Sequence, residues 1–128
     1  MKAAILVVDD VETIRFAIRD YLSRWYDVDE AEDGYTALEI MKTRKIDFVI
    51  TDIRMPGMGG LELVEHLRAD WPSVRYALMT AYNIDDYIQY ARVHQIWNII
   101  PKTTFLDLRF IHAMVEKLLT GQIFGVNR

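Results

Sequence analysis

Short apolar runs alternate with amphipathic segments along this chain, and that alternation limits the folds it can adopt. The runs cover residues 3–8, 28–31, 48–51, 74–80 and 96–100. The first of them contains no polar residue, which is typical of a strand buried on both faces. Strands that alternate with helices form a parallel sheet with helices on both faces. We therefore predict an α/β domain with a doubly wound, five-stranded parallel sheet.

The segments between the runs have apolar residues at helical spacing. They predict helices over about 11–25, 35–41, 60–71, 84–93 and 105–119. The turn signal Asp33-Gly34 opens the second helix, and Gly121 ends the last. The run at 28–31 is partly polar, which indicates a strand at the edge of the sheet.

Five polar residues lie at or just after the ends of four of the apolar runs. Asp9 and Asp10 follow the first run, Asp52 follows the third, Thr80 ends the fourth, and Lys102 follows the fifth after Pro101. The carboxyl ends of parallel strands meet at one edge of the sheet, which is where the binding crevice of a doubly wound fold lies. We therefore expect these five side chains to gather in one site.

A cluster of three carboxylates requires a cation. At about 5 Å and an effective dielectric of about 20, each pair of charges repels by roughly 3 kcal/mol. An all-oxygen site that is open to water and phosphate oxygens suits Mg²⁺. One carboxylate can then attack phosphorus to give an aspartyl phosphate, with Lys102 neutralising charge and Thr80 donating a hydrogen bond.

Each residue taken alone has a simpler explanation. An Asp after a strand is most often a helix cap or a turn residue, and a Lys in that place is commonly solvated. The coincidence of all five at one sheet edge is much less frequent by chance. We therefore prefer the interpretation as a phosphoryl-transfer site.

Several local motifs surround these residues. They are Val-Val-Asp9-Asp10, Ala31-Glu-Asp-Gly34-Tyr-Thr-Ala-Leu38, Asp52-Ile-Arg-Met-Pro56-Gly-Met-Gly-Gly60, Met79-Thr80-Ala81 and Pro-Lys102. Together they resemble the receiver domains of two-component response regulators, of the chemotaxis-type single receiver fold. The resemblance runs from about residue 3 to 119. It implies a (βα)5 flavodoxin-like domain over residues 1–121 with strand order 2-1-3-4-5, and a C-terminal tail or the start of a linker over 122–128.

The resemblance also implies a Mg²⁺ cofactor and its ligands. Asp10 would bind the metal directly, and Asp9 would bind it directly or through water. Asp52 and the backbone carbonyl of Arg54 would complete the protein's share of the ligands.

The same resemblance assigns roles around a phosphoryl group. Asp52 would be the phosphoacceptor, Thr80 the switch hydroxyl and Lys102 the counter-ion of the phosphoryl oxygens. The backbone N–H of Ala81 would be another phosphoryl contact.

A receiver of this kind is a phosphoacceptor switch in a phosphorelay, and the only reactions it catalyses are its own phosphotransfer and autodephosphorylation. The resemblance implies a cognate histidine kinase or phosphotransfer protein as donor. It also implies a downstream protein target or a covalently attached output domain. A homodimer through the face made by 84–93, 96–100 and the last helix is a further expectation.

Composition excludes several other classes of function. The net charge of −4 argues against direct binding of nucleic acid, which favours a basic face. The absence of cysteine excludes disulfides, thiol catalysis and a Cys-based zinc site. The apolar runs are too short to span a membrane, and Met1-Lys2 leads straight into the first strand without a secretory signal. We therefore expect a cytoplasmic protein.

The chain departs from the family pattern in three places. Thr103 stands where the family usually has a proline after the lysine. Ile99 stands where it usually has a Tyr or Phe that turns inward when the switch hydroxyl moves. Gln95-Ile96 replaces the usual small pair at the start of the fifth strand. Coupling of Thr80 to the surface must therefore differ from the usual ring movement or be weak.

Two other functions compete with a phosphorylation switch. A haloacid-dehalogenase phosphatase also uses Asp, Thr or Ser, Lys and Mg²⁺, but it places Asp-x-Asp after its first strand, whereas Asp9 and Asp10 are adjacent. A degenerate receiver used as a constitutive docking module is the other alternative. The complete acidic set argues against it, while Ile99 and Thr103 leave it open.

Overall fold

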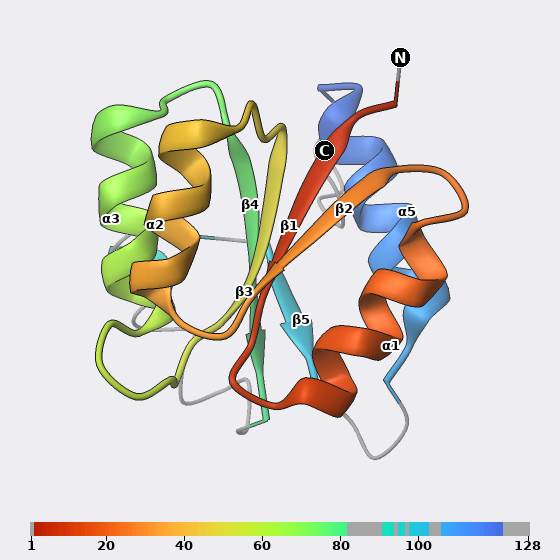
Figure 1. Ribbon diagram of the computed structural model, residues 1–128, viewed down its shortest axis with the longest axis horizontal. Helices are drawn as coiled ribbons and strands as arrows, with labels where there is room; N and C mark the ends of the chain where they lie inside the picture. The colour runs from red at the N-terminus through yellow and green to blue at the C-terminus, as the bar shows by residue number, and fades with distance from the viewer. Residues whose placement is uncertain (1, 82–90, 94, 97, 103–105, 122–128) are drawn as a thin grey trace.

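Five parallel strands form one sheet in the order β2-β1-β3-β4-β5 (Figure 1). The computed structural model describes residues 2–81, 91–93, 95–96, 98–102 and 106–121. In chain order its elements are β1 (Ala4–Val8), α1 (Glu12–Leu22), β2 (Asp27–Ala31), α2 (Gly34–Thr43), β3 (Phe48–Asp52), α3 (Gly60–Asp70), β4 (Arg75–Thr80), β5 (Ile99–Pro101) and α5 (Leu108–Leu119). The predicted fold class and strand order are confirmed.

Helices cover both faces of the sheet, with α1 and α5 on one side and α2 and α3 on the other (Figure 1). Successive side chains of β1 point to opposite faces, so Ile5 and Val7 pack in the core beneath α1 and α5. Leu6 and Val8 pack in the core beneath α2 and α3. Both faces of β1 are therefore apolar, which explains why its sequence shows no alternation.

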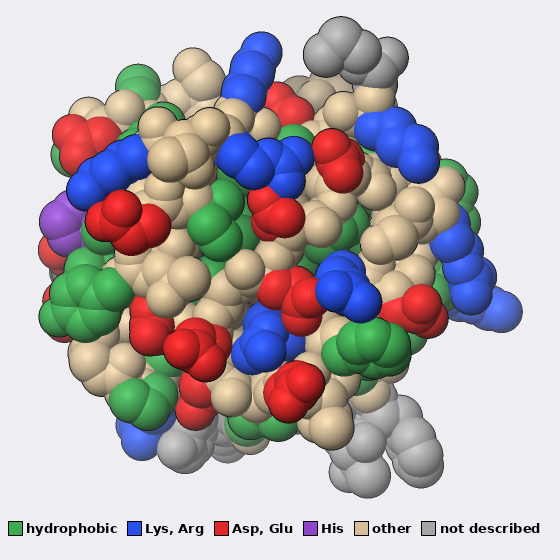
Figure 2. Space-filling view, viewed as in Figure 1, with side chains coloured by type: hydrophobic (Ala, Val, Ile, Leu, Met, Phe, Trp, Pro, Cys, Tyr) green, Lys and Arg blue, Asp and Glu red, His purple; other side chains and the backbone are tan. Residues whose placement is uncertain are grey.

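The edge strand β2 is protected by charged side chains. Asp27 and Asp29 form ion pairs with Arg44, and Glu30 forms ion pairs with two arginines of α1. On the face of the molecule in Figure 2, acidic and basic side chains are intermixed rather than separated by sign. Charges along an exposed edge hinder the addition of a further strand from another chain.

Side-chain caps explain where two helices begin. The Asp33 carboxylate accepts a hydrogen bond from the Thr36 N–H at 2.8 Å, and α2 begins at Gly34 as predicted. The Asp107 carboxylate accepts one from the Phe110 N–H at 3.0 Å, so α5 begins at Leu108 instead of 105. The sequence predicted that this helix would begin at 105. Residues 106–107 are not helical, and 105 is not among the described residues.

The ends of the first and last helices differ in how well the sequence predicted them. The prediction that α1 reaches Trp25 is wrong, because the N–H groups of Trp25 and Tyr26 both donate to the Leu22 carbonyl and the chain turns there. The predicted end of the last helix is confirmed, since α5 ends at Leu119 and Gly121 has a φ of 82°. The domain limit at 121 stays a prediction, and 122–128 lie outside the described part of the chain.

The fifth strand is shorter than its apolar run indicated. It covers Ile99–Pro101 instead of 96–100, because the chain ahead of it is occupied by the end of a helix. Residues 91–93 are helical, as expected for the end of the helix predicted over 84–93. The rest of that helix falls at 84–90, outside the residues that the structure describes.

Gln95 holds the backbone conformation that ends this helix. Its φ is 55°, in the left-handed region. The Ile96 N–H donates to the Ala91 carbonyl at 2.9 Å and the Gln95 N–H to the Arg92 carbonyl at 3.4 Å, which is the hydrogen-bond pair of a Schellman motif. Glycine is the usual residue at this position because it has no Cβ to clash.

Replacing Gln95 by Gly is therefore expected to stabilise the fold by about 1 kcal/mol, because the left-handed conformation costs an L-residue about that much. Thermal unfolding should show a melting temperature several degrees above that of the wild type. Gln95→Ala is the matched control, since it shortens the side chain but keeps the Cβ. A control that stabilises as much as the glycine would contradict this account.

No helix among the residues described here has the length and apolarity needed to cross a membrane.

Candidate functional site

The carboxyl ends of β1, β3, β4 and β5 place the predicted site residues at one edge of the sheet. Asp9 and Asp10 follow β1, and Asp52 is the last residue of β3. One carboxylate oxygen from each of these three residues lies within 4.8 Å of the other two. The sequence prediction that they gather in one cluster is therefore correct.

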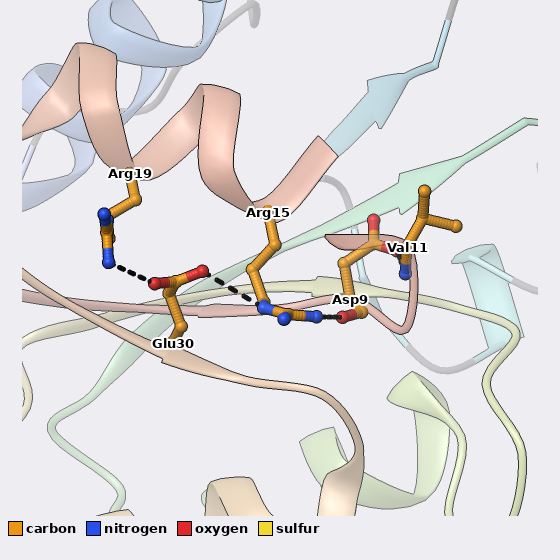
Figure 3. Close-up of polar contacts among 5 residues, drawn as sticks. All are labelled: Asp9, Val11, Arg15, Arg19 and Glu30. Atoms are coloured by element: carbon orange, nitrogen blue, oxygen red, sulfur yellow. Dashed lines mark hydrogen bonds and ion pairs between the residues drawn. The ribbon is translucent and has the colours of Figure 1, made fainter. Parts of the chain in front are cut away.

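Asp9 is the most enclosed of the three carboxylates, with no exposed surface. Its Oδ1 accepts a hydrogen bond from the Val11 N–H at 2.9 Å (Figure 3). Its Oδ2 lies 2.8 Å from Lys102 Nζ in an ion pair, yet accepts no well-directed hydrogen bond from the described residues. A buried carboxylate oxygen in this state has capacity left for a cation.

Asp52 is the central carboxylate of the cluster and is 8% exposed. Its Oδ2 accepts a hydrogen bond from Lys102 Nζ at 2.9 Å. Burial raises the pKa of Asp52, the nearby ammonium of Lys102 opposes that rise, and the charge of Asp9 adds to it. Repulsion among the carboxylates thus contributes to the raised pKa of Asp52, but the main cause is the loss of water around its carboxylate.

Lys102 bridges the two buried carboxylates and acts as the cation of the site in this state. The backbone N–H of Lys102 donates a hydrogen bond to the Thr80 carbonyl at 2.7 Å, which fixes the backbone at this position after β5. Burial lowers the pKa of the Lys102 amine, but the hydrogen bond that it donates to Asp52 and the negative charges of Asp9 and Asp52 outweigh that effect, so the pKa is raised. The lysine thus points into the cluster although Thr103, outside the described residues, replaces the usual proline.

The remaining predicted site residues lie at the end of β4 and in the loops beside this cluster. Thr80 ends β4 and is buried, and Ala81 follows it at the surface. Arg54 lies in the exposed loop between β3 and α3. Asp10 is exposed, so the cluster is open to solvent on its side. The roles of Thr80, Ala81 and Arg54 stay predictions.

The three-carboxylate cluster fits a hard divalent cation. Its donors are all oxygens, one side is open to water, and buried Asp9 Oδ2 has an unused lone pair. These are features of protein sites for Mg²⁺, which binds through few carboxylates and keeps several waters. Lys102 alone cannot neutralise three carboxylates, so the cluster offers negative charge to a bound cation.

Two residues beside the site have no role predicted from the sequence. Gly60 lies against the backbone of the phosphoacceptor candidate, because a Cβ at Gly60 would stand 2.0 Å from the Asp52 carbonyl oxygen. Its N–H donates to the Ile53 carbonyl at 2.9 Å. Arg15 contacts the Asp9 carbonyl from α1. Gly60 belongs to the motif that begins at Asp52, and this motif could have indicated its role. The helical spacing around Arg15 gives no indication that it contacts the site.

Comparison with known proteins identifies the family. The model of the response regulator receiver domain matches residues 5–116. The chain belongs to the response regulator receiver family. The phosphoacceptor role in two-component signalling is characteristic of this family. The haloacid-dehalogenase alternative is set aside.

Bacterial relatives agree with this assignment. The chain is 44% identical over 68 residues to chemotaxis protein CheY-3 of Vibrio cholerae, which is 52% of each chain. It is 33% identical over 90 residues to sporulation initiation phosphotransferase F of Bacillus subtilis, covering 70% of this chain and 73% of that one. The match thus spans about half the length of the Vibrio relative.

A solved receiver has the same fold. Response regulator protein TrrA of Thermotoga maritima, in complex with Mg²⁺-BeF, superposes with a TM-score of 0.78 at 32% identity. The match covers 91% of this chain and 98% of that one.

Proposed function

We propose that Asp52 accepts a phosphoryl group from a phosphohistidine of a histidine kinase or phosphotransfer protein, and that the chain passes this signal on through a conformational change in a phosphorelay. The position of Asp52 carries the proposal. Its carboxylate ends the central strand, is paired with Lys102 and lies beside Asp9 and Asp10. A nucleophile, a fixed counter-ion and further carboxylates for a metal are what phosphoryl transfer requires.

The transfer is a simple exchange of bonds at phosphorus. An Asp52 carboxylate oxygen forms a P–O bond while the P–N bond to the donor imidazole breaks, and the electron pair of that bond stays on the imidazole. Lys102, already 2.9 Å from Asp52 Oδ2, neutralises charge on the transferred group. The Thr80 hydroxyl and the Ala81 N–H donate hydrogen bonds to the remaining phosphoryl oxygens.

The carboxylates of Asp9, Asp10 and Asp52 and the backbone carbonyl of Arg54 are the residues that would hold Mg²⁺. When bound, this ion offsets the negative charge shared by the carboxylates and the phosphoryl oxygens. The aspartyl phosphate is later hydrolysed in the same site, which returns the switch to its resting state.

The output follows from the displacement of Thr80 toward the phosphoryl group. Ile99 lies in β5 opposite Leu78 of β4, so an aliphatic side chain stands where the family uses a ring. We expect the movement to reach the face that includes β5 and α5, through which a downstream protein, an attached output domain or a second copy would bind. A phosphorelay of this kind operates in the cytoplasm, so we expect the chain to act there.

Removal of Mg²⁺ is expected to slow labelling of the chain by phosphoramidate, a small donor with a P–N bond, by at least about 100-fold. A cation at a transferring phosphoryl group supplies several kcal/mol of stabilisation, and each 1.4 kcal/mol is tenfold in rate. Phosphate-affinity electrophoresis measures the rate with Mg²⁺ and with EDTA. Equal rates under the two conditions would refute a metal-dependent mechanism, and a chain that is never labelled would favour the constitutive docking module.

A further inference from the structure

An arginine of α1 binds the backbone of a candidate metal ligand. Arg15 Nη1 donates a hydrogen bond to the Asp9 carbonyl at 2.7 Å. The Nε of the same guanidinium donates to Glu30 Oε1 on β2 at 3.1 Å (Figure 3). One planar group thus joins the helix, the edge strand and the loop that carries the acidic cluster.

This contact completes the restraint of the Asp9 backbone. The Asp9 N–H donates to the Ala31 carbonyl of β2 at 3.1 Å, and its carbonyl accepts from Arg15. The side chain is held by the Val11 N–H. The Asp9 carbonyl belongs to the peptide bond with Asp10, so its orientation also sets the direction in which Asp10 leaves the strand.

Glu30 holds the guanidinium in place from the other side. Its Oε2 accepts a hydrogen bond from Arg19 Nη1 at 2.6 Å, so one carboxylate lies between two arginines (Figure 3). The Arg15 side chain is 15% exposed and that of Arg19 is 42% exposed. Only Arg15 of this pair reaches the Asp9 backbone. The rigid fork of a guanidinium can make both contacts at once, which an ammonium cannot do in the same geometry.

We propose that Arg15 is a positioning residue of the cation site: held by Glu30, it fixes the peptide between Asp9 and Asp10 and so aims the carboxylates that bind the divalent cation. The inference rests on the proposed function, because it needs a site that binds a cation. Groups that orient metal ligands from outside the coordination sphere contribute about 10–100-fold to metal affinity.

Charge and position act in opposite directions here, which makes the proposal testable. A positive guanidinium near the cluster repels a divalent cation, so its removal would tighten Mg²⁺ binding if charge were its only influence. Loss of positioning would weaken binding instead. The sign of the change in affinity therefore separates the two effects.

The experiment measures the dissociation constant for Mg²⁺ by calorimetry on the whole chain. We expect Arg15→Gln to raise it by about 10-fold or more, and Arg15→Lys, which keeps the charge, to fail to restore the wild-type value. Arg19→Gln is the matched control, because Arg19 also pairs with Glu30 but does not contact Asp9. The Mg²⁺ affinity of this variant should stay within about twofold of the wild type. Labelling by phosphoramidate at saturating Mg²⁺ should change far less than the affinity.

Melting curves without Mg²⁺ separate positioning from general destabilisation, since both glutamine variants lose one ion pair with Glu30. If Arg15→Gln does not fold, Glu30→Gln replaces it in the test. This variant releases the guanidinium without removing it, and we expect it to weaken Mg²⁺ binding in the same way. Unchanged or tighter binding in these variants, full rescue by lysine, or an equal loss in Arg19→Gln would overturn the inference. A wild-type chain that binds no Mg²⁺ would instead refute the proposed function.

Discussion

Replacing Asp52 by Asn is expected to reduce phosphorylation by a small phosphodonor to an undetectable level while leaving the fold intact. The amide is nearly the same size as the carboxylate, but its atoms are not nucleophilic toward phosphorus. Asp20→Asn is the matched control, because Asp20 is exposed on α1 away from the cluster and should leave labelling unchanged. Stoichiometric labelling of the Asp52 variant would remove this residue from the mechanism.

The same substitution should raise the stability of the metal-free protein at neutral pH. Burial raises the pKa of Asp52 in the folded state above the value of an unfolded chain. The folded protein therefore binds this proton more tightly than the unfolded one, and stability falls as the pH rises between the two pKa values. Above that range the wild type carries a penalty that Asn lacks.

Melting experiments across pH test this linkage. The stability advantage of Asp52→Asn should be largest near neutral pH and should shrink as the pH falls through the raised pKa of Asp52. Lys102 keeps Asp9 as a partner in the variant, so no unpaired buried ammonium offsets the gain. An advantage that does not depend on pH would show that the carboxylate's burial is not its cause.

Replacing Gly60 by Ala is expected to destabilise the fold by about 3 kcal/mol or more and to impair phosphorylation. An added Cβ would stand 2.0 Å from the Asp52 carbonyl oxygen, so the backbone of the phosphoacceptor strand must shift. Helix propensity favours Ala over Gly by only about 1 kcal/mol at the start of α3, which is too little to compensate. Urea unfolding of both proteins measures the difference.

A second glycine provides the control for this prediction. Gly121 has a φ of 82°, but nothing lies within 4 Å of a Cβ placed there. Gly121→Ala should therefore cost only about 1 kcal/mol, from backbone strain alone. If the two substitutions cost the same, the close approach of Gly60 to Asp52 is not what makes glycine necessary.

The sequence was sufficient to predict the sheet and the residues at its carboxyl edge. Apolar runs such as 3–8 need burial on both faces, and polar residues directly after them must meet where parallel strands end. Asp9, Asp52 and Lys102 come together for this reason, although they are far apart along the chain.

Other features depend on contacts that have no periodic pattern. The start of α5 is set by the cap from Asp107, and the end of α1 by a turn at Leu22, neither of which apolar spacing can place. The apolar character of Ile96 suggested a strand, whereas the left-handed Gln95 beside it ends a helix. Arg15 gave no signal in the sequence, because its contact with Asp9 depends on the tertiary placement of Glu30.

The most direct test of the account is the intact mass of the wild-type chain after incubation with phosphoramidate and Mg²⁺, followed by reduction with borohydride and peptide mapping. If Asp52 is the phosphoacceptor, the mass increases by one phosphoryl group and the peptide map shows a reduced residue at position 52. An unmodified mass under these conditions, or a phosphoryl group found on any other residue, would contradict it.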